Sequence, residues 1–488
     1  MLLKGSIGDN RAAMANPDRL TGLDASFLAL EDAGAHMHVG SCLLFEGEAP
    51  GYNEFVAQLG TRLHLVPRYR QKLAFPPLTQ ARPVWVDDPH FNPGYHVRHT
   101  ALPEPASVEQ LRNVAGRVLA QRLDRGKPLW EIWLVQHVEG GRFAMITKTH
   151  HCLVDGVSGV DIATVLFDVA ADPEPPPEPP PAWHPRPEPS AATLAADALA
   201  ERASGPLDAA RLAVDALAHP DKAAEQLGRA AVGIGAMLRA GLQGAPPSPY
   251  NTPIGPHRRF AWSDGDLAQF KAIKDALGGT VNDVVLTVVT GALRTHMLAN
   301  GHDVDGVELK AMVPVSVRAE AERGALGNRV TSMFAPLPVY ADDPLERLRI
   351  VHDAMQGLKE SGQAVGAELL TQLAGFAPPT VLSQASRLQS SQRAFNVVVT
   401  NVPGPQFPLY MLGRRLLRIY PQVPLVRNTA LGIAIMSYDG TLNFGLLGDY
   451  DALPDLDDLA AALRDAIAEL AAVAGVARKP RSRRTRVS

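Results

Sequence analysis

Apolar and polar residues follow two different spacings along this chain, and each spacing predicts its own kind of element. Residues 142–149 (RFAMITKT) are rich in β-forming types, which predicts a strand. This strand should form a hairpin with residues 130–135 across the Glu-Gly-Gly turn that precedes it. In residues 159–170 the apolar positions recur every three or four residues, as on one face of a helix. The segment between them, residues 150–158, therefore joins a strand end to a helix through a tight turn.

The same two spacings predict a mixture of strands and helices in the rest of the first half. A helix is expected over residues 20–30, with Asp24 or Ser26 as its N-terminal cap, because both side chains can accept a backbone hydrogen bond there. Further helices are expected at residues 53–65 and 108–123, and further strands at residues 41–45, 84–88 and 95–98.

The second half repeats this mixture. Asp439 and Gly440 form a dipeptide that is typical of type I′ turns, so the strands on either side of it should form a hairpin. A helix over residues 263–277 should be capped near its beginning at Ser263. The other expected strands lie at residues 260–262, 309–317, 330–336, 395–400, 431–438 and 442–447, and the other expected helices at residues 284–298, 343–361 and 455–473.

A proline-rich segment separates the two halves. Residues 172–189 (DPEPPPEPPPAWHPRPEP) form neither helix nor sheet, because proline lacks the backbone donor and fixes φ, so a stiff spacer is expected. Alanine-rich residues 190–242 then predict two or three connecting helices. The expected organisation is a flexible leader at 1–19, a first domain at 20–171, a connector at 172–250, a second domain at 251–475 and a basic, disordered tail at 476–488.

Composition narrows the class of protein further. With 46% hydrophobic residues the chain has enough apolar material for two cores, and its net charge of −4 does not favour a nucleic-acid partner. Two cysteines indicate a reducing compartment. Residues 1–20 lack the sustained apolar core of a signal peptide, and no apolar run is long enough to span a bilayer. We expect a cytoplasmic protein, with peripheral binding to the inner membrane face or to lipid droplets as a further expectation; either Met1 or Met14 could be the true start.

The candidate chemistry lies at the end of the strand at 142–149, where His150 and His151 follow one another. Adjacent strand residues point to opposite faces, so one imidazole should pack or orient while the other faces a cavity. Asp155 can accept a hydrogen bond from an imidazole or hold an arginine, and Gly156 allows the backbone angles of a turn. No third His or Cys stands nearby at ligand spacing, so no metal site is expected.

The HHxxxDG pattern of residues 150–156 resembles the active-site motif of an acyltransferase superfamily. This superfamily includes chloramphenicol acetyltransferases, peptide-synthetase condensation domains and acyl-CoA-dependent lipid acyltransferases. Residues 443–449 (NFGLLGD) depart from the DFGWG-like segment of the condensation branch and favour the lipid branch. Three further stretches resemble the bacterial wax ester synthase/diacylglycerol acyltransferase family: Pro128-Leu129-Trp130, Asn282-Asp283 and Asn401-Val402-Pro403-Gly404-Pro405.

The resemblance covers residues 20 to about 473 and implies an α/β (α+β) fold of two chloramphenicol-acetyltransferase-like domains, with the active site in a tunnel between them. It implies that His151 is the general base, with His150 and Asp155 in the same motif. Asn282 would stabilise the oxyanion, and Arg318 is the candidate partner of Asp155. Apart from the resemblance, Asp283 is expected to cap the following helix, because its side chain can accept a backbone hydrogen bond there. Gly156 and the Pro128-Leu129-Trp130 stretch would support the site.

The reaction implied by the resemblance is transfer of a long-chain acyl group from acyl-CoA to diacylglycerol, which gives triacylglycerol. Long-chain alcohols are a second implied acceptor and would give wax esters. Both substrates would bind together in a ternary complex, with acyl-CoA as co-substrate and no other cofactor. Two alternatives remain open: a carrier-protein-dependent acyltransferase of polyketide lipid or peptide synthesis, and a catalytically silent lipid-droplet binding protein.

Overall fold

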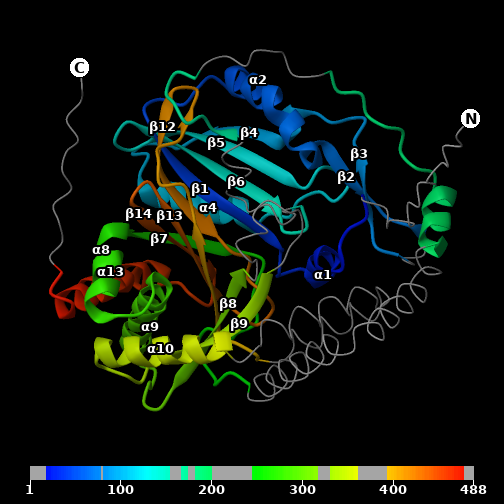
Figure 1. The fold of residues 1–488 in the computed structure, drawn as a ribbon. Coiled ribbons are helices and arrows are strands. Elements are labelled where there is room, and N and C mark those ends of the chain that lie inside the picture. The colour runs from blue at the N-terminus through cyan, green and yellow to red at the C-terminus, as the bar shows by residue number, and fades with distance from the viewer. Residues whose placement is uncertain are drawn as a thin grey trace, which may run out of the picture.

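The computed structural model describes residues 18–77, 81–153, 166–173, 182–200, 244–316, 330–360 and 393–476. Two six-stranded β-sheets form its two halves, and helices pack around them (Figure 1). A small two-stranded sheet, β2 (Gln71–Ala74) and β3 (Val84–Asp87), lies beside the first half. Both large sheets have buried apolar side chains on both faces, so each half has a substantial core of its own.

The first sheet has the strand order β11-β12-β1-β6-β5-β4. Its strands are β1 (His38–Glu46), β4 (Val97–Ala101), β5 (Trp130–Val138), β6 (Arg142–His150), β11 (Tyr410–Met411) and β12 (Arg414–Gln422). The helical elements of this half are α1 (Gly22–Leu30), α2 (Tyr52–Arg62), η1 (Leu63–Leu65), η2 (Pro67–Arg70), α3 (Pro93–His96) and α4 (Val108–Ala120). The expected hairpin of β5 and β6 is present, with antiparallel pairing.

The second sheet has the strand order β7-β14-β13-β10-β8-β9. Its strands are β7 (Arg258–Asp266), β8 (Glu308–Ser316), β9 (Val330–Pro338), β10 (Val397–Pro403), β13 (Leu431–Tyr438) and β14 (Thr441–Asp449). The helices are α8 (Leu267–Leu277), α9 (Val281–Ala299), α10 (Pro344–Glu360) and α13 (Leu456–Val473). Asp439 and Gly440 both have positive φ, at 41° and 79°, which confirms the type I′ signal between β13 and β14.

Residues 410–422 cross from the second half of the sequence into the first sheet. There β12 pairs with β1 in antiparallel fashion, and Leu43 stands opposite Ile419. The same strand also packs against β13 and β14 of the second sheet (Figure 1). The domain limits expected at residues 171 and 251 stay predictions, but this exchange shows that the first sheet is completed by residues from the second half.

The contact between β12 and β14 depends on a glycine. A Cβ atom placed on Gly445 would overlap the backbone carbonyl oxygen of Pro421, which no rotamer change can move away. We expect Gly445→Ala to lower the free energy of unfolding by about 3 kcal/mol, the upper part of the usual range for overpacking. Chemical denaturation tests this. Gly357→Ala is the control, because its added Cβ meets nothing within 4 Å on α10; equal stability of the two variants would contradict the prediction.

Several expected boundaries are wrong for local reasons. Thr21, not Asp24 or Ser26, caps α1, because its hydroxyl accepts the Asp24 N–H while the Ser26 hydroxyl donates to a carbonyl within the helix. The chain from Ser263 to Asp266 continues β7 because it pairs with β14, and Asp266 caps α8 instead. Residues 95–96, expected in a strand, belong to the short helix α3.

Some expected elements lie outside the described residues: the leader up to residue 17, residues 159–165 of the expected helix, the connecting helices at 201–243, and the tail from residue 477. Among the residues that are described, no single helix is long and apolar enough to cross a bilayer. Helices α8 and α9 pass that test only as a pair, and the chain bends by 100° between them. Most of α9 is buried in the core of the second half.

Candidate active site

The strand β6 ends at His150, and His151 begins a turn. Two backbone hydrogen bonds hold this point: the His150 N–H donates to the Leu129 carbonyl at 2.9 Å, and the His151 N–H donates to the Met37 carbonyl at 2.7 Å. His150 is buried, whereas part of His151 stays exposed although the Nδ1 atom of its ring is buried. The two imidazoles therefore lie in different environments although they are neighbours in sequence.

His150 holds the turn that follows it. Its Nδ1 accepts a hydrogen bond from the Cys152 N–H at 3.1 Å, so the proton of the neutral ring lies on Nε2. That Nε2 lies 3.9 Å from the Glu31 carboxylate. Burial, with a further contribution from the Arg125 guanidinium, lowers the pKa of His150 to about 3. His150 is therefore neutral across the physiological range, which suits a structural partner of the turn.

His151 has the properties of a general base. Its ring stacks on Phe27 of α1, with the ring centroids 4.0 Å apart and the planes inclined by 29°. Burial lowers the pKa of its imidazole below the ordinary value, since an imidazolium is poorly solvated in these surroundings. The ring is therefore neutral at pH 7 and can accept a proton from a hydroxyl group.

A buried acidic residue, which sequence reasoning missed, lies behind the histidine pair. Glu31 directly follows α1, and its carboxylate lies 3.8 Å from Nε2 of His38 as well as close to His150. The Arg125 guanidinium donates to Glu31 at 2.9 Å through Nε. No local pattern around Glu31 marks it, because its partners come from β1, β6 and the segment after α4. The role of Glu31 could have been predicted only from the pairing of β1 with β6, which places His38 opposite His150.

His36 and His38 lie close together before and at the start of β1, with ring centroids 5.7 Å apart. Burial lowers the pKa of both rings. In the described part of the chain, no group of three or more His, Cys, Asp or Glu side chains could hold a metal ion.

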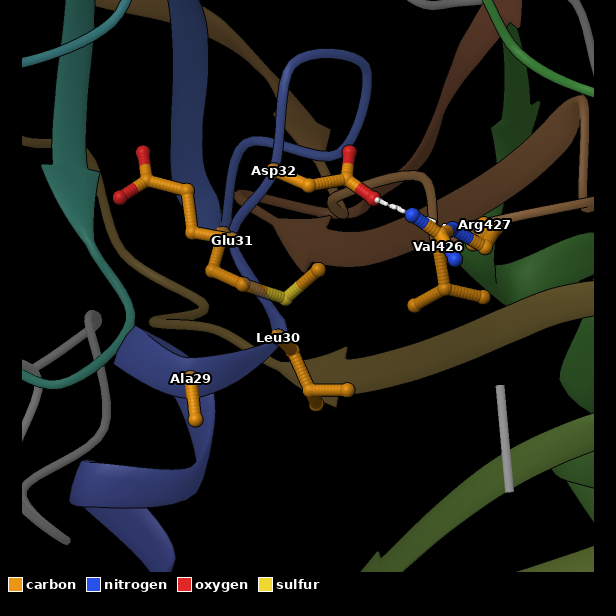
Figure 2. A pocket seen from close by; sticks show the side chains of 7 residues that line it. Ala29, Leu30, Glu31, Asp32, Val426 and Arg427 are labelled. Carbon is orange, nitrogen blue, oxygen red and sulfur yellow. Dashed lines mark hydrogen bonds and ion pairs between the residues drawn. The ribbon is translucent and has the colours of Figure 1, made fainter. Parts of the chain in front are cut away.

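A cavity of about 210 Å³ is lined by seven residues, among them two that contact the histidine pair (Figure 2). It includes Met37, whose carbonyl accepts from His151, and Glu31, whose carboxylate faces His150. Asp32 and Arg427 form an ion pair across it at 2.8 Å, which joins the segment after α1 to the loop before β13. The remaining lining residues are Ala29, Leu30 and Val426. The cavity is thus formed by both halves of the chain.

The Asn282-Asp283 stretch lies at the N-terminus of α9. Asp283 forms a capping box with Thr280 and also accepts from Nδ1 of His352 at 2.9 Å. Asn282 accepts a hydrogen bond from the Asn401 side chain at 3.3 Å through its Oδ1. The second and third family-like stretches therefore meet in space. Among the described residues, no hydrogen bond joins Asn282 to His151.

The Pro128-Leu129-Trp130 stretch supports the end of β6. The Leu129 carbonyl accepts the His150 N–H, and Trp130 is buried, with its Nε1 donating to the Tyr69 carbonyl at 2.8 Å. The Trp130 ring also stacks on His96 with a centroid separation of 4.5 Å. This rigid support fixes the position from which the histidines leave the sheet.

Three candidate residues cannot be placed. Asp155, Gly156 and Arg318 lie outside the residues that the structure describes. The expected ion pair of Asp155 with Arg318 therefore stays a prediction.

The two mixed sheets, with β12 of the first packed against β13 and β14 of the second, form a chloramphenicol-acetyltransferase-like fold. Solved condensation domains have this fold, including those of the calcium-dependent antibiotic synthetase (TM-score 0.56, 18% identity) and rhizomide synthetase (TM-score 0.56, 14% identity). The family model for the wax ester synthase/diacylglycerol acyltransferase catalytic domain matches residues 20–285, and the model for its C-terminal domain matches residues 326–471. The chain belongs to this family.

The sequences of individual relatives align with nearly the whole chain. The probable diacylglycerol O-acyltransferase tgs1 of Mycobacterium tuberculosis is 33% identical over 460 residues, covering 93% of this chain and 96% of the relative. The probable diacylglycerol O-acyltransferase tgs2 of the same species is 34% identical over 464 residues, covering 93% and 98%. The solved wax ester synthase/diacylglycerol acyltransferase of Marinobacter aquaeolei is 29% identical with a TM-score of 0.65, covering 94% of this chain and 100% of that one. The expected fold class, family and enzyme class are confirmed.

Proposed function

We propose that this chain transfers a long-chain fatty acyl group from acyl-CoA to diacylglycerol, giving triacylglycerol, and to long-chain alcohols, giving wax esters. The observation that carries the residue-level proposal is the neutral imidazole of His151 at the end of β6, whose backbone N–H is bound by Met37, a residue of the cavity that both halves line. Membership of the family supports the choice of substrates.

The proposed reaction needs a group that accepts a proton and a group that donates a hydrogen bond to the oxyanion. His151 takes the proton of the acceptor hydroxyl as its oxygen attacks the thioester carbonyl, forming the new C–O bond. The Asn282 amide or backbone N–H groups donate to the oxyanion of the tetrahedral intermediate. When the C–S bond breaks, the thiolate of CoA leaves and the imidazolium returns the proton to it. Because His151 acts as a base and not as a nucleophile, both substrates must be bound together.

The test follows CoA release from palmitoyl-CoA by the purified chain, with diacylglycerol or hexadecanol as acceptor in lipid vesicles. We expect CoA release that depends on the acceptor, together with triacylglycerol or wax ester as product. Release only from an acyl group on a carrier protein would favour the carrier-dependent alternative. Binding to the vesicles without turnover on any donor would favour the silent lipid-binding protein. We also propose that the chain binds a membrane or lipid-droplet surface peripherally, and binding with turnover would support this.

The pH dependence of kcat/KM gives a further prediction. His151 must be neutral to accept a proton, and burial lowers its pKa, so kcat/KM should be constant near pH 7 and fall only as the pH drops through that lowered value. The acid limb is therefore expected below pH 6.5, roughly the ordinary pKa of histidine. A pH–rate profile of the native chain with both substrates measures it. A limb centred above 6.5 would contradict a buried imidazole as the base.

A further inference from the structure

Helix α1 carries an aromatic ring to the face of the His151 imidazole. Phe27 lies near the end of this helix, and its ring stacks on His151 at a centroid distance of 4.0 Å. The helix is held in place at its C-terminal end: Arg125 donates to the Leu28 carbonyl at 3.0 Å and to the Glu31 side chain. The next residue, Leu28, is buried in the core of the first half. The stacked ring therefore sits on a fixed support.

We infer that Phe27 is a positioning residue for the general base: it sets the plane of the His151 ring and keeps water from one of its faces. This inference rests on the proposed function, because it assigns Phe27 a task in the same reaction. It goes beyond the HHxxxDG motif, since Phe27 belongs to a different element of the chain.

Backbone hydrogen bonds hold the main chain at His151 and at the residue that follows it. The N–H groups of His151 and Cys152 are bound by Met37 and His150, which fixes the path of the turn. The imidazole can still rotate about its terminal torsion, for which histidine has broad preferences. In the described part of the chain, the aromatic ring that contacts His151 is that of Phe27. A flat neighbour at stacking distance restricts this rotation, and it does so without a polar contact that would compete for the proton.

The titratable and charged residues near the turn at His151 come from several elements. Substitution of Phe27 changes none of these residues. Asp24 lies one turn earlier on α1, Glu31 directly follows this helix, Arg125 follows α4, and His150 ends β6. A change in the protonation of His151 in a Phe27 variant would therefore report the lost ring and not a lost charge.

Three substitutions separate the two tasks of the ring. Phe27→Ala removes both the flat ring that sets the plane of His151 and the apolar group that keeps water from its face. Phe27→Leu keeps the apolar group without the flat ring, and Phe27→Tyr keeps both. We expect kcat to fall about tenfold or more in the Ala and Leu variants, with both KM values within about twofold of native, because small misplacement of a reacting group is costly. The acid limb of kcat/KM should move to higher pH in the Ala variant only. Phe27→Tyr should stay near native in both respects.

The same substitution at exposed Phe75 is the control, because Phe75→Ala should change neither kcat nor the acid limb. NMR titration of the His151 ring, assigned with His151→Ala, reports the protonation change without turnover, so the inference can be tested even if the proposed reaction fails. A raised acceptor KM with native kcat would overturn it and make Phe27 a substrate contact. Native kcat and native His151 titration in folded Phe27→Leu and Phe27→Ala would also overturn it.

Discussion

Replacing His151 by alanine is expected to lower the turnover of palmitoyl-CoA with diacylglycerol by about 10²-fold or more, the usual contribution of a positioned general base. The imidazole of His151 is neutral, because burial lowers its pKa. Without it the acceptor hydroxyl must lose its proton to water. Steady-state CoA release measures the effect, and the KM of acyl-CoA should change little, because His151 acts on the acceptor.

The control for this experiment is His90→Ala, since His90 is an exposed histidine of the same half. Its turnover should match the native chain. Thermal unfolding of both variants separates a lost base from a lost fold. Equal turnover of His151→Ala and the native chain would remove His151 from the mechanism, whatever the family resemblance implies.

Replacing Lys148 by methionine is expected to lower the free energy of unfolding by about 3 kcal/mol, in the range for breaking a buried ion pair. Lys148 is fully buried on β6, two residues before His150, and its Nζ lies 3.3 Å from the Glu131 carboxylate. The same ammonium donates to the carbonyls of Val118 and Gln121 at the C-terminus of α4, at 3.0 and 2.9 Å. Methionine fills the space but takes the charged donor away from all three acceptors.

Chemical denaturation followed by tryptophan fluorescence measures this loss. Lys271→Met is the matched control, because Lys271 lies exposed on α8 and should cost less than about 0.5 kcal/mol. Adding Glu131→Gln to Lys148→Met should cost less than the sum of the two single changes, since the second change removes the charge whose ammonium partner the first has removed, although Arg98 and Trp133 also contact Glu131. A Lys148→Met variant as stable as Lys271→Met would show that the buried pair contributes nothing net.

Some site features were missed because their signal is not local. Glu31 and Phe27 lie more than 110 residues before His151 in the sequence, and nothing in their own neighbourhood distinguishes them from other residues of an amphipathic segment. Their role follows from the place of α1 against the end of β6. By contrast, the capping role of Asp283 was predictable, because a cap is formed by residues that are three apart.

The sequence by itself determined the local elements, the hairpins and the motif positions. Alternation, helical spacing and turn dipeptides act over a few residues, so the pairing of β5 with β6 and of β13 with β14 could be read from them. Only the tertiary structure decided that β12 completes the first sheet, that Asn282 meets Asn401, and that Phe27 covers His151. These contacts join residues far apart in the chain, and they depend on sheet order and on how the two cores pack, which no local spacing encodes.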